Sequence, residues 1–222
     1  MRNLTLLIPA KNEKESLPKV LDEIQNLGFD AKIILKEDDK ETIDAIKNFD
    51  YEILYQSGEG YGDALIYGIN NCKTDFYCIF NADGSFDPRE IKSMLENLIQ
   101  NNLDIIFGSR YQKNSGSEDD TIVTLIGNYI FTYIGKIFFS LPINDILYTF
   151  VIGKTQETQN LNLKQKDFSF CVELPIKAKK CNLNISSYPC YERTRIAGIK
   201  KVNAFKDGSL ILIHMIKLFF LK

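Results

Sequence analysis

The sequence is informative first through what it has little of. Its 27 basic and 29 acidic residues give a formal net charge of −2, so it lacks the basic excess by which many proteins bind nucleic acid. It has a single histidine, His214, and its five cysteines include no Cys-x-x-Cys pair. Both shortages argue against a zinc site. We therefore expect no nucleic-acid partner and no structural zinc.

Other motifs are missing as well. Met1 leads directly into an apolar run with no small-residue cleavage site after it, so we expect no secretory signal, a cytoplasmic location and reduced cysteines that serve as small core residues. No strand-like run is followed by Gly-x-Gly-x-x-Gly, which argues against a dinucleotide oxidoreductase. The residues after the first run, Pro9-Ala10-Lys11-Asn12, do not form the glycine-rich loop of a sugar-phosphate nucleotidyltransferase.

What is present is an alternation of short apolar runs and helical stripes. With 222 residues and 45% apolar content, the chain can build a sizeable core. Ser16 is expected to cap the first helix, and Asp87-Pro88-Arg89-Glu90 is expected to be a capping box with proline at the first helical position. The alternation predicts an α/β fold, a Rossmann-like, mostly parallel sheet with helices on both faces. Strands are predicted at 4–8, 32–35, 51–55, 75–80 and 103–107, and helices at 16–27, 40–47, 62–72 and 87–100.

The chain changes character after Gly108. Residues 112–120 are polar and without periodicity, which predicts a mobile loop. Residues 121–143 are strongly apolar with Lys136 as the only charge, but glycines and the Ser140-Leu141-Pro142 break divide them. We expect one or two helices lying in a membrane surface, with a membrane span as the alternative. The run 210–221 predicts a C-terminal amphipathic helix that is interfacial or packs on the domain.

The stretch FYCIFNADGSFDPREI holds the strongest chemical signal, because Asp83 follows a predicted strand and precedes a helix. Ligands of open α/β sheets collect at the carboxyl ends of the strands. A carboxylate there can hold a divalent cation, which is a natural partner for diphosphate oxygens. The plainer alternative is that Asp83-Gly84 is only a turn before the helix.

Several motifs in order resemble one family. LLIPAKNEKESL, KEDDKET, GEGYGDALIYGI, NADGSFDP, GSRY, FSFCVEL and YPCYERTRIAGIKK are similar to segments of the inverting glycosyltransferases of the GT-A fold, family 2, in the dolichol- or polyprenyl-phosphate mannosyltransferase-like branch. Two positions depart from the family pattern: Asn81 replaces the first aspartate of the Asp-x-Asp box, and Lys200 replaces a serine.

The resemblance implies a set of site residues. It places Mg²⁺ or Mn²⁺ on Asp83, and it makes Arg195 a catalytic group that stabilises the departing diphosphate. Asp145 and Glu173 are the candidate general bases, needed only if the acceptor is a hydroxyl. The implied substrate-binding residues are Pro9, Ala10, Asn12, Glu13, Glu37, Asp38, Asp39, Gly60, Asp63, Asn81, Ala82, Asp83, Ser85, Arg110, Arg195 and Lys201.

The function that the resemblance implies is transfer of a sugar from a nucleoside-diphosphate sugar, with inversion, to a polyprenyl or dolichyl phosphate or a lipid-linked glycan. Residues 1–111 are expected to be the nucleotide-sugar-binding core, and residues 112–222 the acceptor side of the same catalytic domain. The protein is expected to lie peripherally on the cytoplasmic face of a membrane. The alternative is an impaired relative that binds nucleotide sugars, or a regulatory protein.

Overall fold

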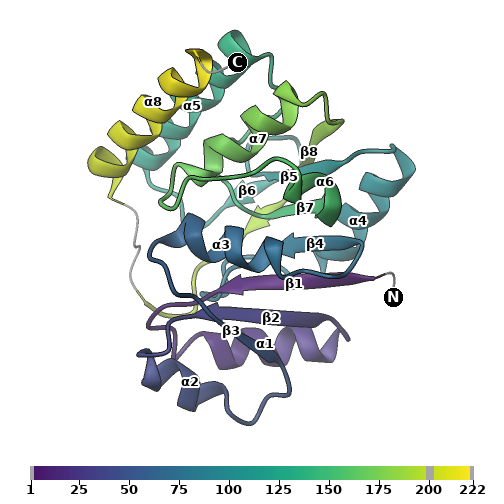
Figure 1. Ribbon diagram of the computed structural model, residues 1–222, viewed down its shortest axis with the longest axis vertical. Helices are drawn as coiled ribbons and strands as arrows, with labels where there is room; N and C mark the ends of the chain where they lie inside the picture. The colour runs from purple at the N-terminus through teal and green to yellow at the C-terminus, as the bar shows by residue number, and fades with distance from the viewer. Residues whose placement is uncertain (1–2, 199–202, 221–222) are drawn as a thin grey trace.

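A seven-stranded sheet forms the centre of the protein. The computed structural model describes residues 3–198 and 203–220 (Figure 1). The strand order is β3-β2-β1-β4-β7-β5-β8, and only β7 runs antiparallel to its neighbours in this sheet. The predicted α/β fold with a mostly parallel sheet is confirmed. The strands are β1 (Leu4–Pro9), β2 (Asp30–Leu35), β3 (Glu52–Tyr55), β4 (Phe76–Ile79), β5 (Ile105–Ser109), β7 (Val151–Lys154) and β8 (Ile185–Pro189).

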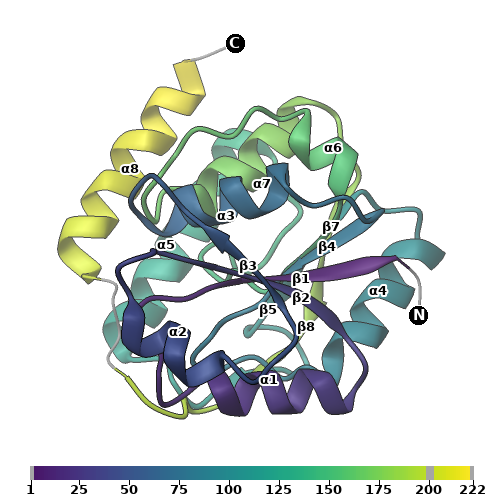
Figure 2. The same cartoon turned by 60° about the horizontal axis from the view of Figure 1, so that its bottom comes forward.

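Helices cover both faces of this sheet (Figure 2). In β1, Leu6 and Ile8 belong to one apolar cluster and Leu7 to the other, because successive side chains of a strand point to opposite faces. This explains why β1 is apolar on both faces, with Thr5 as its one polar residue. The helices are α1 (Leu17–Asn26), α2 (Lys40–Ile46), α3 (Tyr61–Asn70), α4 (Glu90–Gln100), α5 (Ile122–Phe139), α6 (Thr155–Gln159), α7 (Phe170–Lys180) and α8 (Ala204–Phe220).

Three local predictions were wrong in whole or in part. Ser16 occupies the N-cap position of α1 as expected, but its side chain makes no capping hydrogen bond, because its hydroxyl donates to Glu13 Oε2 over 2.6 Å. The box at 87–90 does not open α4, since Asp87 accepts the Arg89 N–H over 2.9 Å in a local turn and the helix begins only at Glu90. Among the cysteines, four are buried as expected, but Cys181 is exposed.

Residues 112–120 contain a short strand that the sequence did not indicate. β6 (Gly116–Ser117) pairs in parallel with β9 (Tyr191–Glu192), and the Glu118 N–H then donates to the Glu192 carbonyl over 2.9 Å. The expectation of a loop without regular structure is corrected by this pairing. The partner lies about 75 positions away in sequence, where local polarity gives no sign of it.

The segment expected to hold one or two apolar helices is the single helix α5. It begins after Thr121, whose side chain accepts the Thr124 N–H, and it ends at Ser140 in the left-handed conformation (φ 53°). Gly135 does not break the helix; a Cβ there would lie 2.9 Å from Leu141, so glycine permits close packing of the following turn.

α5 buries two polar side chains and exposes many apolar ones, although Phe131, Ile134 and Phe139 are partly buried against the core. Its buried residues are Asn128, Thr132 and Gly135. Its exposed residues include Ile122, Val123, Ile126, Tyr129, Ile130, Tyr133, Ile137 and Phe138. α8 lies beside α5 (Figure 1) and also exposes apolar side chains, among them Leu212, Ile213, Ile216 and Phe219. We call the exposed apolar side chains of α5 and α8 together the apolar face.

A buried ion pair connects α5 to the sheet. Arg110, which follows β5, donates Nε to Asp145 Oδ2 over 2.7 Å and Nη2 to Asp145 Oδ1 over 3.0 Å, and Nη1 donates to Glu192 Oε2 over 3.1 Å. Its guanidinium also lies 4.6 Å from the centroid of the Tyr148 ring. Asn128 of α5 donates to Asp145. We call these five residues the Arg110 cluster.

Charge pairing stabilises this cluster despite its burial. Burial alone would lower the pKa of Arg110, but Asp145 and then Glu192 hold that pKa well above its usual value. Asp145 is fully buried, so removing its charge leaves the guanidinium with Glu192 as its remaining anionic partner in the cluster. A buried charge that loses its partner is strongly destabilising.

We therefore predict that Asp145→Asn lowers the free energy of unfolding by about 3 kcal/mol. The measurement is urea denaturation followed by circular dichroism. The matched control is Glu52→Gln, which removes the more exposed partner of the Lys32–Glu52 pair and should cost less than about 1 kcal/mol. Equal effects of the two substitutions would contradict the structural role given to Asp145.

Candidate active site

The predicted donor-binding segments meet at one edge of the sheet. β1 pairs in parallel with β2 and with β4 (Figure 1), so the loops that follow these three strands lie next to one another. Pro9 and Ala10 end β1, and the Ala10 N–H donates to the Ile34 carbonyl over 2.8 Å. The sequence segments around Asn12, Asp39 and Asp83 are therefore brought to the same edge, the place where open α/β sheets bind ligands.

The turn after β1 is fixed to the turn after β2. The Asn12 N–H donates to Asp39 Oδ2 over 2.7 Å, with Asn12 in the left-handed region (φ 54°). The Glu13 N–H donates to Thr42 Oγ1 over 3.0 Å. Of the three acidic candidates after β2, Asp39 is the one that accepts the Asn12 N–H, whereas Glu37 and Asp38 are exposed.

Asp83 lies in the loop after β4 with its two oxygens in different environments. Oδ1 accepts the Ser85 N–H over 3.0 Å, and Oδ2 lies 3.5 Å from Arg195 Nη1. Ala82 and Ser85 are buried beside it. Gly84 has φ 82°, and a Cβ there would lie 2.4 Å from Ile196, so both the backbone conformation and the close approach require glycine.

Asn81 faces the start of α3. Tyr61 donates its hydroxyl to Asn81 Oδ1 over 3.4 Å and lies 2.7 Å from Thr149 Oγ1. Burial raises the pKa of Tyr61 well above its usual value, so its hydroxyl is protonated at neutral pH. Asn81 is therefore part of a neutral hydrogen-bonded group, not a second carboxylate beside Asp83.

Residues 191–198, which we call the strap, cross this loop. The Arg193 N–H donates to the Ser85 carbonyl over 2.8 Å, and the Ile196 N–H donates to the Asp83 carbonyl over 2.7 Å. Two backbone contacts and the Ile196–Gly84 packing thus place Arg195 next to Asp83. Lys201, the other basic residue predicted for this arm, lies outside the described residues.

The start of α3 is covered by another loop. Gly60 has φ 104°, and a Cβ on it would lie 2.1 Å from the Lys166 carbonyl oxygen. Asp63 accepts from Gln56 over 3.1 Å and pairs with Lys166 over 3.1 Å. These contacts give Gly60 and Asp63 a role in packing the 164–167 loop against α3.

Glu173 supports the same loop. Its carboxylate accepts the N–H groups of Lys164 and Gln165 over 2.9 and 2.8 Å, and it pairs with Lys177 over 2.9 Å. Glu173 is almost fully buried. Like Asp145 in the Arg110 cluster, it is a carboxylate already engaged by several donors. Arg110, predicted to bind phosphate or sugar, is likewise occupied by two carboxylates.

The residues around Asp83 could hold a cation only if a bound diphosphate and water supplied its other ligands. Among the residues that the structure describes, no group of three or more His, Cys, Asp or Glu side chains could hold a metal ion. Asp83 can supply one carboxylate, and Mg²⁺ commonly takes one or two carboxylates while substrate phosphates and water complete its shell. The site therefore suits a cation that shares its ligands with a diphosphate.

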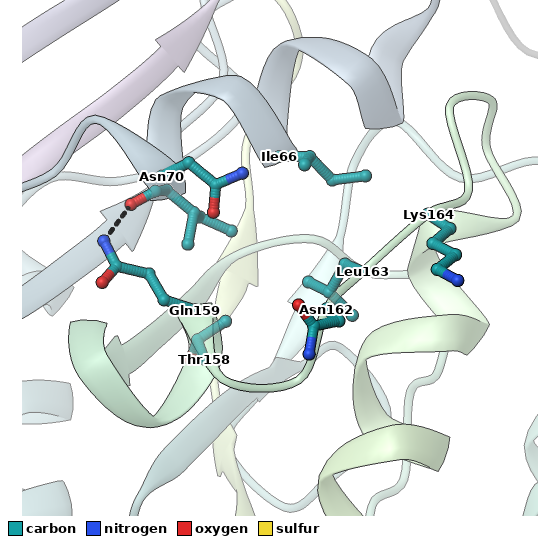
Figure 3. Close-up of a pocket in the computed structure, with 8 residues that line it drawn as sticks. Ile66, Asn70, Thr158, Gln159, Asn162, Leu163 and Lys164 are labelled. Atoms are coloured by element: carbon teal, nitrogen blue, oxygen red, sulfur yellow. Dashed lines mark hydrogen bonds between the residues drawn. The ribbon is translucent and has the colours of Figure 1, made fainter.

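A small cavity of about 150 Å³ lies between α3, α6 and residues 162–164 (Figure 3). Gln159 lines one end of it and donates to the Ile69 carbonyl over 2.8 Å. No residue predicted for the active site lines this cavity.

A larger groove of about 500 Å³ lies on α5. Its lining is mostly apolar, with three tyrosines and one cation, Lys136, whose Nζ donates to Asn144 over 2.6 Å. Tyr111, the neighbour of Arg110 in sequence, forms part of this lining. The lining residues are Tyr111, Tyr129, Ile130, Thr132, Tyr133, Lys136 and Asn144.

Sequence reasoning missed three residues at the site. Asp119 binds Arg195 through two hydrogen bonds, Tyr61 contacts Asn81, and Glu192 completes the Arg110 cluster. The run Glu118-Asp119-Asp120, set in a segment expected to be a loop, was the available signal for Asp119. Tyr61 and Glu192 lie within the quoted motifs GEGYGDALIYGI and YPCYERTRIAGIKK, but their residue types alone did not single them out.

Comparison with known proteins identifies the family. The model of "Glycosyl transferase family 2" matches residues 5–160. An uncharacterized glycosyltransferase of Mycobacterium tuberculosis is 22% identical over 210 residues, covering 95% of this chain and 94% of its own length. A UDP-N-acetylglucosamine–dolichyl-phosphate N-acetylglucosaminyltransferase of Methanococcus voltae is 24% identical over 208 residues, with 83% of each chain covered.

Solved structures share the fold. Glucosyl-3-phosphoglycerate synthase from M. tuberculosis, in complex with Mn²⁺, uridine diphosphate and glucosyl-3-phosphoglycerate, aligns with a TM-score of 0.73 at 11% identity, covering all of this chain and 81% of that one. Mannosyl-3-phosphoglycerate synthase from Rubrobacter xylanophilus has a TM-score of 0.73 at 12% identity, with 97% and 73% covered. The family match extends over most of the chain, and the chain belongs to glycosyl transferase family 2.

Proposed function

We propose that this glycosyltransferase moves a sugar from a nucleoside-diphosphate sugar to a polyprenyl or dolichyl phosphate at a membrane surface. The observation that carries the donor half is the placement of Asp83 at the carboxyl edge of the sheet, with Arg195 3.5 Å away and the Asn12–Asp39 contact on the neighbouring loops. A carboxylate at this edge can bind a cation, and the guanidinium beside it can bind a diphosphate.

In this proposal each residue has a definite task. Mg²⁺ or Mn²⁺ bound with the diphosphate would neutralise charge on the leaving nucleotide. Asp83 holds that cation, and Arg195 donates to phosphate oxygens, as charge-assisted hydrogen bonds are well suited to do. The residues of the first two turns, including Asn12, Glu13 and Asp39, surround the nucleoside.

The candidate bases favour a phosphate acceptor. Asp145 is fully buried against Arg110, and Glu173 accepts two backbone N–H groups while pairing with Lys177. Neither carboxylate is free to remove a proton from a hydroxyl. A lipid phosphate is already anionic and attacks the anomeric carbon without a base, so the occupied carboxylates agree with that acceptor. The M. voltae relative is named for transfer to dolichyl phosphate.

The acceptor side is supported by α5. Within the described ranges, α5 is the one helix long and apolar enough to cross a membrane by length and composition, and only 17% of it is buried. Asn128 and Thr132 face the protein, and most of its large apolar side chains are exposed. In a helix lying on a membrane, the outward side would enter the lipid boundary. We place the protein peripherally on the cytoplasmic face, with the tyrosine-lined groove next to the lipid acceptor.

A second candidate function is binding of nucleotide sugars without turnover. Asn81 in place of the family aspartate favours it, since that substitution removes a charge near the cation position. The two functions differ in turnover. Such a protein would bind nucleotide weakly or without metal and would show neither sugar transfer nor donor hydrolysis.

We predict that Asp83→Ala lowers sugar transfer by about 10²- to 10³-fold, because a group that stabilises leaving-group charge is lost. The assay follows radiolabelled sugar moving from UDP-N-acetylglucosamine or a guanosine-diphosphate sugar into polyprenyl phosphate, with Mn²⁺ present and after its removal by chelation. Asp44→Ala, an exposed change on α2, is the control and should keep full activity. Unchanged transfer in Asp83→Ala would remove the assigned role.

We also predict that Ile126→Glu combined with Ile130→Glu weakens binding to phosphatidylcholine–phosphatidylglycerol vesicles by about tenfold or more, because both side chains lie on the apolar face. Co-sedimentation measures the bound fraction. The control carries Gln25→Glu and Gln100→Glu, equal in added charge but placed on α1 and α4. If both double variants bind as the wild type does, the apolar face does not contact lipid.

A further inference from the structure

Arg195 is held by a carboxylate outside the family motifs. Asp119 Oδ2 accepts from Nη2 over 2.7 Å, and Asp119 Oδ1 accepts from Nε over 3.1 Å. The remaining nitrogen, Nη1, lies 3.5 Å from Asp83 Oδ2, which is longer than a charge-assisted hydrogen bond. The guanidinium thus binds Asp119 through two short contacts and faces Asp83 through one longer contact.

The position of Asp119 is fixed relative to the strap. The Asp119 N–H donates to Ser117 Oγ over 3.2 Å, and Ser117 belongs to β6, which pairs with β9 at the start of the strap. Glu118 Oε2 accepts both the N–H and the hydroxyl of Thr194 over 3.1 Å. Asp119 therefore lies on the segment that follows β6, and Arg195 lies on the strap. These two segments are hydrogen-bonded to each other through the β6–β9 pairing and through Glu118 and Thr194.

The charges of Asp119 and Arg195 decide whether Asp83 can bind a divalent cation. One guanidinium lies between two carboxylates of similar exposure, 14% for Asp119 and 16% for Asp83. If Asp119 lost its charge, Asp83 would become the stronger attraction for Arg195. A guanidinium closing on Asp83 would occupy the oxygen that a divalent cation needs, and its positive charge would oppose the cation.

We propose that Asp119 is a positioning residue that holds Arg195 away from Asp83, so that Asp83 remains available to a divalent cation while Arg195 stays within reach of the diphosphate. The inference rests on the function proposed above for the Asp83 site. It assigns a role to the acidic run at 118–120, which lies outside the motifs that carry the family resemblance.

The first test is a crystal structure of Asp119→Asn without nucleotide or metal. We expect Arg195 to move to within about 3 Å of Asp83, the length of a charge-assisted hydrogen bond. A guanidinium that stays at the wild-type separation, or that turns into solvent, overturns the proposal. This result does not depend on whether the protein transfers sugar.

The second test is calorimetric titration of uridine diphosphate at increasing Mn²⁺ concentration. Asp119→Asn should need about tenfold more Mn²⁺ for half-maximal nucleotide binding, the low end of the effect of outer-shell partners on metal affinity. Asp119→Glu, which keeps the charge, should stay near the wild type. Adding Arg195→Gln to Asp119→Asn should lower the Mn²⁺ requirement below that of Asp119→Asn alone, because the competing cation is then gone, while nucleotide affinity falls with the loss of the Arg195 contact to phosphate.

Glu118→Gln is the matched control, since it keeps an acceptor for Thr194 and leaves Asp119 unchanged. It should show the wild-type Mn²⁺ requirement, and a shift equal to that of Asp119→Asn would assign the effect to a loosened strap and overturn the proposal. Wild-type protein that binds neither uridine nor guanosine diphosphate with Mn²⁺ would instead contradict the proposed function, and the Asp119→Asn crystal structure would still decide the role of Asp119.

Discussion

The pairing of Arg110 with Asp145 and Glu192 is the interaction on which the arrangement of the second half of the chain depends. It joins the end of β5, the segment before β7, the short strand β9 and, through Asn128, the helix α5. These elements are far apart in sequence. A buried ion pair is a weak source of net stability, but it strictly selects one geometry, because any other packing would leave a buried charge without a partner.

The family resemblance assigned the residues of the Arg110 cluster and those around Asp83 to one substrate site. Arg110 and Asp145 resemble substrate-binding and catalytic residues in sequence, yet in the structure they bind each other. Charged side chains near the edge of the sheet include Asp39, Asp83 and Arg195, together with the partner of Arg195, Asp119. Arg110 and Asp145 are engaged in a structural cluster, and Asp83 and Arg195 are the candidates for the donor site proposed above.

Local patterns were sufficient for the parts of the fold that depend on neighbours in sequence. The continuous apolar run of β1 and the helical stripe of α1 predicted both elements, and the breaker residues after β4 placed Asp83 at a strand end. Pairings between distant segments could not be predicted this way. The antiparallel insertion of β7 between β4 and β5 and the contact of Asp119 with Arg195, 76 positions apart, depend on tertiary packing. The side-chain cap of α1 failed for a local reason, because the Ser16 hydroxyl donates to Glu13, three positions earlier, and not to the helix backbone.

The reversed polarity of α5 has a consequence for how its sequence tolerates change. In most helices of water-soluble domains, inward positions accept apolar residues and outward positions accept charges. On α5 the hydrogen bonds of Asn128 and Thr132 face inward, so an aliphatic replacement there would strand the polar groups they now serve. Charged replacements at the exposed apolar positions would leave folding largely intact. A mutational scan read by hydrophobicity alone would thus misjudge both the buried polar positions and the exposed apolar positions of this helix.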